Sequence, residues 1–593
     1  MKRLLTGNEA IARGAWEAGV RFASAYPGTP STEILQNLAG YGEILAEWAP
    51  NEKVSLEAVV GASMAGVRTM AAMKHVGVNV AADPLFTFSY TGVNGGTVII
   101  TADEPGQHSS QNEQDNRWYA QSAKLPMLEP ANSQECLDMV KEGFRLSEEF
   151  DVPVLLRLTT RVCHSKGVVE CGERVEQEVK AYVKDAAKFV MVPHNARVRR
   201  VVVEERMAAL GKAVESSALN FIEKGGKTGV IASGVCRHYA REVFGDKATY
   251  LDLGFTYPYP DKILDEFVAV VDEIYVVEEN DPYLLNWIRA RGHGAKVRPV
   301  FPKYGELTPD VLRRALGMAP LPNIDYDKSM AVPRPPALCA GCPHRGFFYE
   351  LAKRKDICIT GDIGCYTLGF AEPFNSMDSC ICMGGAFSVG HGFNQAAKLS
   401  GGKVRAVGVL GDSTFFHMGI NSLVEVVYNN SNTVCVILDN RTTAMTGSQD
   451  HPGTGKDARG NKAPALDIAA ICKAIGVAHV IEIQPNDLSA INKALDEALA
   501  FDGPSVILTT WPCVLKKMDD TERALYDAPF GMMYYIDDSC IGCAICLKCG
   551  CPAISLDKST KKADINEVIC VGCGVCEQIC PVKSIKFDEG SDV

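Results

Sequence analysis

Residues 404–440 have the sequence VRAVGVLGDSTFFHMGINSLVEVVYNNSNTVCVILDN. The apolar runs VRAVGVL and VCVIL are typical of buried strands, and a helical pattern lies between them. This order predicts two parallel strands joined by a helix. The first strand ends at Gly411 and Asp412 and the second at Asp439 and Asn440, so a carboxylate and an amide should meet at the carboxyl edge of one sheet.

The same alternation extends through most of the chain. In the first 165 residues it predicts helices and strands in turn, with helices at 8–17, 31–38 and 57–73 and strands at 78–83 and 97–103. From about residue 227, the runs KTGVIASGV, TYLDLGF and EIYVVEEN predict a smaller α/β domain. A proline-rich linker should follow at 316–342. Further strands at DICITGD and PSVILTTW belong to the same α/β unit as residues 404–440, which are called the opening motif below. The fold class is therefore α/β and multidomain.

Composition excludes several classes of protein. The chain has 593 residues, a net charge of -12 and 22 cysteines. An excess of acidic residues repels a phosphate backbone, so no nucleic-acid partner is expected. The start MKRLLTGNEA lacks the apolar core of an export signal, and no run of apolar residues predicts a membrane span. We expect a cytoplasmic protein, whose reduced cysteines need an explanation other than disulfides.

The cysteines are concentrated near the C-terminus in two runs that each end in Cys-Pro. The spacing of the second run is that of bacterial iron–sulfur proteins, in which three cysteines bind one cluster and the Cys-Pro cysteine binds the other. One 4Fe-4S cluster is therefore expected at Cys540, Cys543, Cys546 and Cys580, and a second at Cys570, Cys573, Cys576 and Cys551.

The first run is one residue longer than usual before its Cys-Pro and contains the additional Cys549. The cluster of the first run could therefore be atypical, and a second open alternative is that Cys549 replaces Cys551 as the ligand that this run gives to the other cluster. Thiolates also suit zinc, so a pair of zinc sites is the alternative. Two triplets that each end in Cys-Pro favour iron–sulfur clusters.

The opening motif predicts a metal site. Asp412 and Asn440 can supply oxygen ligands to Mg2+, which can in turn hold a diphosphate, and the carbonyl of Thr442 would be a third ligand. Gly411 and Ser413 complete the turn, which is similar to the signature of thiamine diphosphate enzymes. Asp and Asn also serve as ordinary turn residues at strand ends, so the interpretation depends on the flanking strands.

Motifs along essentially the whole chain extend this likeness: GNEAIARGAWEAGV, YPGTPSTEI, NEKVSLEAVVGASMAG, KHVGVNVAADPL, CAGCPHRGFFY, GDIGCYTLG, GDSTFFHMGI, LDNRTTAMTG and HPGTG. Together with the cysteine-rich end, they resemble the large subunits of the indolepyruvate:ferredoxin oxidoreductases, within the thiamine diphosphate-dependent 2-oxoacid:ferredoxin oxidoreductases.

The resemblance implies oxidative decarboxylation of arylpyruvates to aryl-acetyl-CoA and CO2, with electrons passed to ferredoxin. Its implied partners are a small beta subunit, ferredoxin and coenzyme A, in a hetero-oligomer with two copies of each subunit. The implied domains are a pyrimidine-binding domain (1–170), a connector with a transketolase C-terminal-like domain (171–320), a diphosphate and Mg2+ domain (321–525) and a two-cluster ferredoxin-like α+β module (526–593).

The resemblance also implies three catalytic residues. Glu57 would activate the cofactor by sharing a proton with its pyrimidine ring, whereas by itself it would be an ordinary solvated helical residue. Thr29 would bind the 2-oxoacid carboxylate, or else cap the helix that follows it. Arg117 would be the cationic partner of that carboxylate, or else a surface ion pair.

A further set of cysteines corresponds to positions that bind a cluster close to thiamine in pyruvate-type relatives. It comprises Cys339, Cys342, Cys365 and Cys513. The alternatives are a third cluster, which would shorten the electron path, or small buried residues. In the segment SQDHPGTG, His451 is a candidate polar group near the substrate, or else a solvated loop residue.

Two other functions remain open at this stage. A noncatalytic iron–sulfur subunit of a larger redox complex would use only the C-terminal cysteines and would leave Asp412, Asn440 and Glu57 without a role. A thiamine enzyme that acts on another 2-oxoacid would use the same residues with a different substrate pocket. A nonoxidative decarboxylase is disfavoured because it has no use for the clusters.

Overall fold

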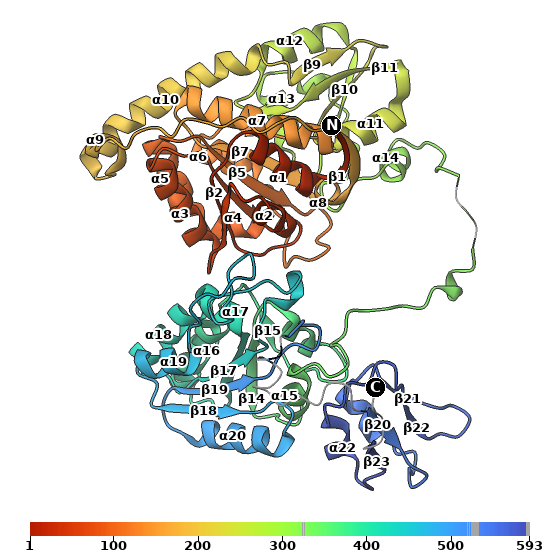
Figure 1. Cartoon of the computed structure of the whole chain (residues 1–593). Helices are drawn as coiled ribbons and strands as arrows, with labels where there is room; N and C mark the ends of the chain where they lie inside the picture. Colours follow the sequence, from red (N-terminus) through yellow and green to blue (C-terminus); the bar gives the residue numbers. More distant parts are fainter. Residues whose placement is uncertain (323, 325, 519, 521, 523–532, 589–593) are drawn as a thin grey trace. The chain divides into compact units, whose positions relative to one another are not determined.

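The computed structural model describes residues 1–322, 324, 326–518, 520, 522 and 533–588. The chain divides into an N-terminal unit, Met1–Tyr326, and a C-terminal unit, Asp327–Val593 (Figure 1). The division lies within the expected proline-rich linker. The finer boundaries at 170 and 320 stay predictions, and the boundary at 525 lies outside the described residues.

The N-terminal unit begins with a seven-stranded sheet in the order β12-β6-β7-β5-β4-β2-β3. Its strands are parallel except β12, which pairs antiparallel with β6. The strands are β2 (Phe22–Ala25), β3 (Leu45–Trp48), β4 (Thr69–Lys74), β5 (Thr97–Asp103), β6 (Met127–Leu128), β7 (Val154–Thr159) and β12 (Phe255–Tyr257). All seven residues of β5 are buried, as in a strand covered on both faces.

Helices surround this sheet, and α7 packs on both α1 and the strands β5 and β7. Helix α1 starts with a capping box in which Thr6 and Glu9 exchange hydrogen bonds. The helices are α1 (Gly7–Glu17), α2 (Thr32–Ala39), α3 (Glu52–Met64), α4 (His75–Val80), α5 (Ala82–Thr91), α6 (Arg117–Ala123), α7 (Ser133–Phe150) and α8 (Thr160–His164). A small hairpin pairs β1 (Lys2–Thr6) with β8 (Lys166–Glu170).

Two sequence-based assignments in this region were wrong. The expected strand at 78–83 is helical, and the expected helix at 57–73 ends at Met64. The strand of this region is β4, whose alanines and methionines have low strand propensity but lie between two parallel neighbours. Tertiary pairing therefore outweighs local preference here.

The second half of this unit is the smaller α/β domain. Its sheet has the order β13-β10-β11-β9, with β9 antiparallel at the edge. The elements are α9 (Ala186–Phe189), α10 (Pro193–Glu215), β9 (Asn220–Glu223), β10 (Thr228–Ser233), α11 (Cys236–Phe244), β11 (Ala248–Leu253), α12 (Asp261–Val270), β13 (Glu273–Val277), α13 (Tyr283–Ala290) and α14 (Pro309–Ala315). Strand β12 comes from this half and completes the first sheet, so the two halves share one edge.

The C-terminal unit contains a six-stranded parallel sheet in the order β15-β14-β16-β17-β19-β18. The opening motif forms β16, α18 and β17 as expected. The elements are α15 (His344–Leu351), β14 (Ile357–Gly361), β15 (Ser379–Cys380), α16 (Ala386–Ser400), β16 (Arg405–Gly411), α17 (Asp412–Thr414), α18 (Ile420–Tyr428), β17 (Val434–Asp439), α19 (Ile468–Ile475), β18 (His479–Ile483), α20 (Leu488–Ala500) and β19 (Ser505–Thr510).

The described part of the cysteine-rich module contains two antiparallel strand pairs and one short α-helix, besides a 3-10 helix at Ile545–Cys549. They are β20 (Met533–Ile536) with β23 (Ile585–Asp588), β21 (Ile554–Leu556) with β22 (Ala563–Ile565), and α22 (Val575–Ile579). Its buried apolar residues join those of the six-stranded sheet in one continuous core. The expected α/β class is confirmed. Among the described residues, no helix combines the length and apolar character of a membrane span.

Candidate active site

Asp412, Asn440 and Thr442 lie together at the carboxyl edge of the six-stranded sheet. Strands β16 and β17 are paired in parallel register, so Asp412 and Asn440 leave the sheet side by side. The Thr442 amide donates to Asp412 Oδ2 and to Asn440 Oδ1, at 3.2 Å in both cases. All three residues are buried. The structure thus brings together the three residues predicted as ligands.

The turn at Gly411 requires a residue without a side chain. A Cβ at Gly411 would lie 2.6 Å from Cε1 of Tyr366, well inside contact distance. The Tyr366 hydroxyl lies 2.7 Å from Thr414 Oγ1, and the Ser413 hydroxyl accepts a hydrogen bond from Thr443. The hydroxyl of Ser413 is therefore accommodated without loss of the turn.

Charged and titratable groups surround Asp412. His451 Nε2 lies 2.9 Å from Asp412 Oδ2. Burial by itself would raise the pKa of Asp412, but the interaction with His451 outweighs it, so the pKa lies below its usual range. Burial and the Asp412 charge raise the pKa of Asp439 to about 7. Burial lowers the pKa of His344, 3.4 Å from the Asn440 amide nitrogen, to about 4.

This donor set fits Mg2+. The ion prefers oxygen ligands, and the cluster offers a carboxylate, an amide oxygen and a nearby backbone carbonyl in a buried position. Neutral His344 adds no competing positive charge.

The cysteines of the two runs line two separate cavities. The first cavity is lined by residues between 536 and 585, among them Cys540, Cys543, Cys546 and Cys580. The second is lined by residues that include Cys551, Cys570, Cys573 and Cys576. The grouping matches the crossed arrangement expected from the two Cys-Pro motifs.

Cys549 does not line either cavity. Its side chain is 1% exposed, and burial raises its pKa to about 12. Cys551, two residues further along the chain, lines the second cavity. The geometry therefore favours Cys551 over Cys549 as the residue of that set.

The third set of cysteines converges beside Asp412. The thiols of Cys342, Cys365 and Cys513 interact electrostatically with one another, and Cys339 interacts with Cys365 and Cys513. Burial raises the pKa of Cys342 to about 12 and that of Cys365 to about 11. The Cys513 amide donates to the Asn440 carbonyl at 2.9 Å. Within the described part of the chain, no three His, Cys, Asp or Glu residues are grouped as a site for a single metal ion.

Comparisons with known proteins agree with this site. Residues 13–232 match the family model "Pyruvate flavodoxin/ferredoxin oxidoreductase, thiamine diP-bdg", and residues 362–508 match "Thiamine pyrophosphate enzyme, C-terminal TPP binding domain". The chain is 39% identical to "Indolepyruvate oxidoreductase subunit IorA" of Archaeoglobus fulgidus, over 99% of this chain and 97% of the relative. It is 40% identical to the protein of the same name from Methanothermobacter marburgensis, over 98% and 97%.

The chain belongs to the IorA family of 2-oxoacid:ferredoxin oxidoreductases. It is thus an oxidoreductase subunit with domains of the thiamine diphosphate-binding type. The resemblance seen in the sequence motifs is confirmed over almost the whole chain.

Glu57 lies on the solvent side of α3. Its side chain is 49% exposed and pairs with Lys53 at 3.2 Å. Glu52, the first residue of the same helix, is only 5% exposed. The Glu52 carboxylate lies against α4, where a Cβ at Gly77 would fall 2.7 Å from Glu52 Oε1. In this IorA-family chain, Glu52 is therefore the one of these two α3 carboxylates that is shielded from water.

Thr29 is half-buried in the loop that leaves β2. The helix after it begins at Thr32 with Ser31 as the N-cap, so capping does not explain Thr29. The side chain of Lys74 runs past the same loop, because a Cβ at Gly28 would lie 3.2 Å from Lys74 Cδ. Burial lowers the pKa of Lys74.

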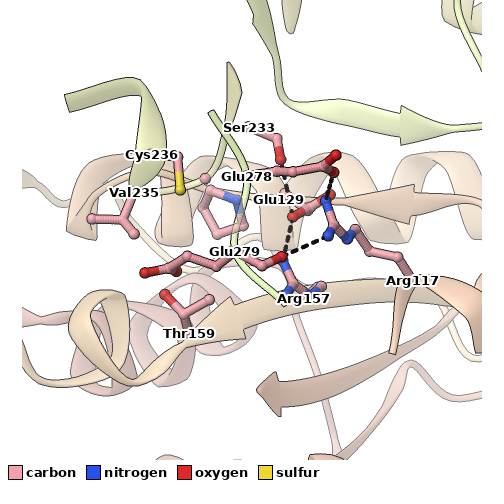
Figure 2. A pocket seen from close by; sticks show the side chains of 11 residues that line it. Arg117, Glu129, Arg157, Thr159, Ser233, Val235, Cys236, Glu278 and Glu279 are labelled. Atoms are coloured by element: carbon pink, nitrogen blue, oxygen red, sulfur yellow. Dashed lines mark hydrogen bonds and ion pairs between the residues drawn. The ribbon is translucent and has the colours of Figure 1, made fainter. Parts of the chain in front are cut away.

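Arg117 is buried in a network of charges between the two halves of the N-terminal unit (Figure 2). It is 1% exposed, and its guanidinium binds Asp115 Oδ2 at 2.6 Å and Glu278 Oε2 at 3.0 Å. It also donates to the carbonyls of Glu279 and Asp281. A substrate carboxylate would have to displace these partners. The alternative of a surface ion pair does not hold either, because Arg117 and its acidic partners are buried.

The network continues through Arg157. Its guanidinium pairs with Asp103 at 2.6 Å and with Glu129 at 2.7 Å, and it also donates to Asn280 Oδ1 at 3.0 Å. Figure 2 shows Arg157 and Arg117 beside Glu129, Glu278 and Glu279. This arrangement joins the smaller α/β domain to the first sheet.

Sequence reasoning missed four residues at or near these sites: Glu52, Lys74, His344 and Asp439. Glu52, Lys74 and His344 stand within the quoted motifs, Lys74 as the last residue of β4, and Asp439 precedes the predicted ligand Asn440. Only burial distinguishes them from solvated residues of the same type.

Proposed function

We propose that this chain is the catalytic subunit of an enzyme that oxidatively decarboxylates arylpyruvates to aryl-acetyl-CoA and CO2 and reduces ferredoxin. The observation that carries the proposal is the presence, in one structural unit, of a diphosphate-type site and two cysteine-lined cavities. The similarity to IorA proteins supports the aryl substrate class and the small beta subunit. Two copies of each subunit and a cytoplasmic location belong to the same proposal.

In this proposal, Asp412, Asn440 and the Thr442 carbonyl hold Mg2+, and Gly411 and Ser413 leave room for the diphosphate. Thiamine diphosphate, when bound, supplies an electron sink for the carbanion formed as CO2 leaves. The buried, neutral His344 limits the positive charge near the metal, and His451 orients the Asp412 carboxylate. These residues position the cofactor at the edge of the sheet.

The acid that activates the cofactor lies on α3. Glu57 is the residue that the motif resemblance indicates, but proton sharing is most effective for a carboxylate shielded from water. Burial therefore favours Glu52. The matched variants E52Q and E57Q separate the two: removal of the activating acid should lower kcat by about two to four orders of magnitude, and the other variant should change it little. A large loss in E57Q alone would favour Glu57.

Thr29 is the proposed contact for the 2-oxoacid carboxylate. Arg117 was its expected partner, but Lys74 is the cation that runs past the Thr29 loop, and its nearest carboxylate, Glu104, lies 3.9 Å from its ammonium. We therefore propose Lys74 as the partner. A K74M variant should raise KM for the 2-oxoacid at least tenfold, and an unchanged KM would contradict this assignment.

The two cysteine sets are proposed to hold two 4Fe-4S clusters that pass electrons to ferredoxin one at a time. The acyl group passes to coenzyme A. Cys339, Cys342, Cys365 and Cys513 are proposed to hold a third cluster, because they converge beside Asp412. Iron analysis of the anaerobic complex tests the number: about twelve irons per chain are expected, and about eight would contradict the third cluster.

The decisive experiment is a steady-state screen of five 2-oxoacids with coenzyme A and ferredoxin. The substrates are indolepyruvate, phenylpyruvate, hydroxyphenylpyruvate, pyruvate and 2-oxoglutarate. Preference for an arylpyruvate is expected, and preference for pyruvate or 2-oxoglutarate would overturn the substrate assignment. Electron transfer with no 2-oxoacid turnover, despite bound thiamine diphosphate, would favour the noncatalytic alternative.

A further inference from the structure

Arg345 is a buried cation with no acidic partner in the described part of the chain. It lies in α15, is 1% exposed and is one of the largest fully buried side chains of the protein. Among the described residues, no carboxylate forms an ion pair with it, and its Nε has no hydrogen-bond partner. Buried charges in proteins are normally paired, because an isolated one is costly to desolvate.

The guanidinium of Arg345 instead bridges two cysteine loops through their backbone. Nη1 donates to the Cys549 carbonyl at 2.6 Å. Nη2 donates to the carbonyls of Leu338 and Cys339, at 2.8 and 2.6 Å. The charge therefore lies between the loop of residues 339–342 and the cysteine-rich module.

The loop held by Arg345 borders the second cysteine cavity. Ala340 and Gly341 line this cavity together with its four cysteines, and the lining of the first cavity lies entirely between residues 536 and 585. A Cβ at Gly341 would lie 1.9 Å from Val571 Cγ2, so the two loops are in direct contact. The Arg345 charge also acts on the thiols of Cys573, Cys549 and Cys342.

A cluster held by four thiolates is the anion that this position lacks. The thiolates give the cluster a net negative charge, and each one-electron reduction adds one further negative charge. A fixed cation in a buried environment stabilises the added electron, because the attraction is screened less than in water.

We propose that Arg345 is the internal counter-ion of the cluster at Cys551, Cys570, Cys573 and Cys576, and that its charge raises the reduction potential of this cluster relative to the one at Cys540, Cys543, Cys546 and Cys580. Arg345 is a positioning residue that does not bind iron. The inference rests on the proposed iron–sulfur function.

The test compares R345Q and R345K with the wild type in the full complex, reconstituted anaerobically. R354Q is the matched control, because Arg354 pairs with Asp496 near the surface. Iron content is measured first, and each cluster is then titrated with redox mediators and followed by electron paramagnetic resonance. C576S and C365S variants identify the signals of the second cluster and of the proposed third cluster, because Arg345 also contacts the loop that carries Cys339 and Cys342.

In R345Q, the reduction equilibrium of the second cluster should shift at least tenfold toward the oxidised form, which is 59 mV for one electron. The first cluster should keep its potential. R345K should retain most of the wild-type potential because it keeps the charge, and R354Q should leave both clusters unchanged.

Several results would overturn the inference. If R345Q retains its iron and neither potential moves, or if both move equally, Arg345 is not the counter-ion and the iron–sulfur function stands. If R345Q does not fold or loses iron, R345K decides, because a folded lysine variant with equally low iron would show that the fork geometry matters and the charge does not. A wild-type complex without iron would overturn both the inference and the proposed function.

Discussion

Replacement of Arg117 by methionine distinguishes a structural role from a substrate-binding role. The variant leaves Asp115 and Glu278 buried without the guanidinium that lies 2.6 and 3.0 Å from them. Removal of one partner from a buried ion pair costs about 3 to 5 kcal/mol, because the remaining charge stays desolvated. At roughly 2 to 4 °C per kcal/mol, the melting temperature of the N-terminal unit should fall by about 10 °C.

The assay is scanning calorimetry of the full chain, with KM for the 2-oxoacid measured at a temperature where both proteins are folded. R145M is the matched control, since Arg145 is 55% exposed and pairs with Glu142 on the same surface helix. Exposed pairs contribute about 0 to 1 kcal/mol, so R145M should melt close to the wild type.

One result would refute the structural role of Arg117. If R117M melts like the wild type and KM rises at least tenfold, Arg117 binds the substrate carboxylate, as the sequence resemblance suggested. A lower melting temperature with an unchanged KM supports the role in joining the two halves of the N-terminal unit.

Three further variants test other parts of the structure. Burial raises the pKa of Glu279 to about 7, so the residue contributes to folding most fully below pH 4.5, where it is protonated. As the pH rises through 7, the buried charge lowers the free energy of unfolding by up to roughly 3 kcal/mol. In denaturant titrations from pH 5 to 8, the free energy of unfolding should decline less for E279Q than for the wild type, and an equal decline would contradict the shift. G341A should lower the melting temperature of the C-terminal unit and its iron content, because Gly341 has a φ of 68° and a Cβ there would clash with Val571; unchanged values would mean that the loop moves freely. G211A should stabilise the protein by about 1 kcal/mol, because Gly211 lies inside α10 with open space around it; a lower melting temperature would contradict this.

The parts of the structure that depend on local pattern could be predicted from the sequence. Apolar runs with a polar residue at each end located β16 and β17, and parallel pairing then required Asp412 and Asn440 to meet. The crossed grouping of the cysteines followed from spacing alone. In each case the residues that interact are fixed by a short motif or by the geometry of one sheet.

The features that depend on distant contacts could not be predicted. Glu52 and Glu57 lie on the same helix, and only the contact with α4 shows which of them is buried. Arg117 binds Glu278, which lies 161 residues further along the chain. Strand β12 joins a sheet whose other strands end about one hundred residues earlier. No local pattern carries this information.

The continuous core of the C-terminal unit has a consequence for how the protein matures. Apolar residues beside the cysteines, such as Ile554 and Ile579, belong to the same core as the strands that carry Asp412 and Asn440. If the two cysteine sets hold clusters as proposed, a newly made chain without iron would lack the ligands that tie the cysteine loops to this core. Correct folding of the sheet that carries Asp412 and Asn440 would then depend on the supply of iron. In a cell short of iron, most incomplete subunits would lack both catalysis and electron transfer, and few would lack only one of the two.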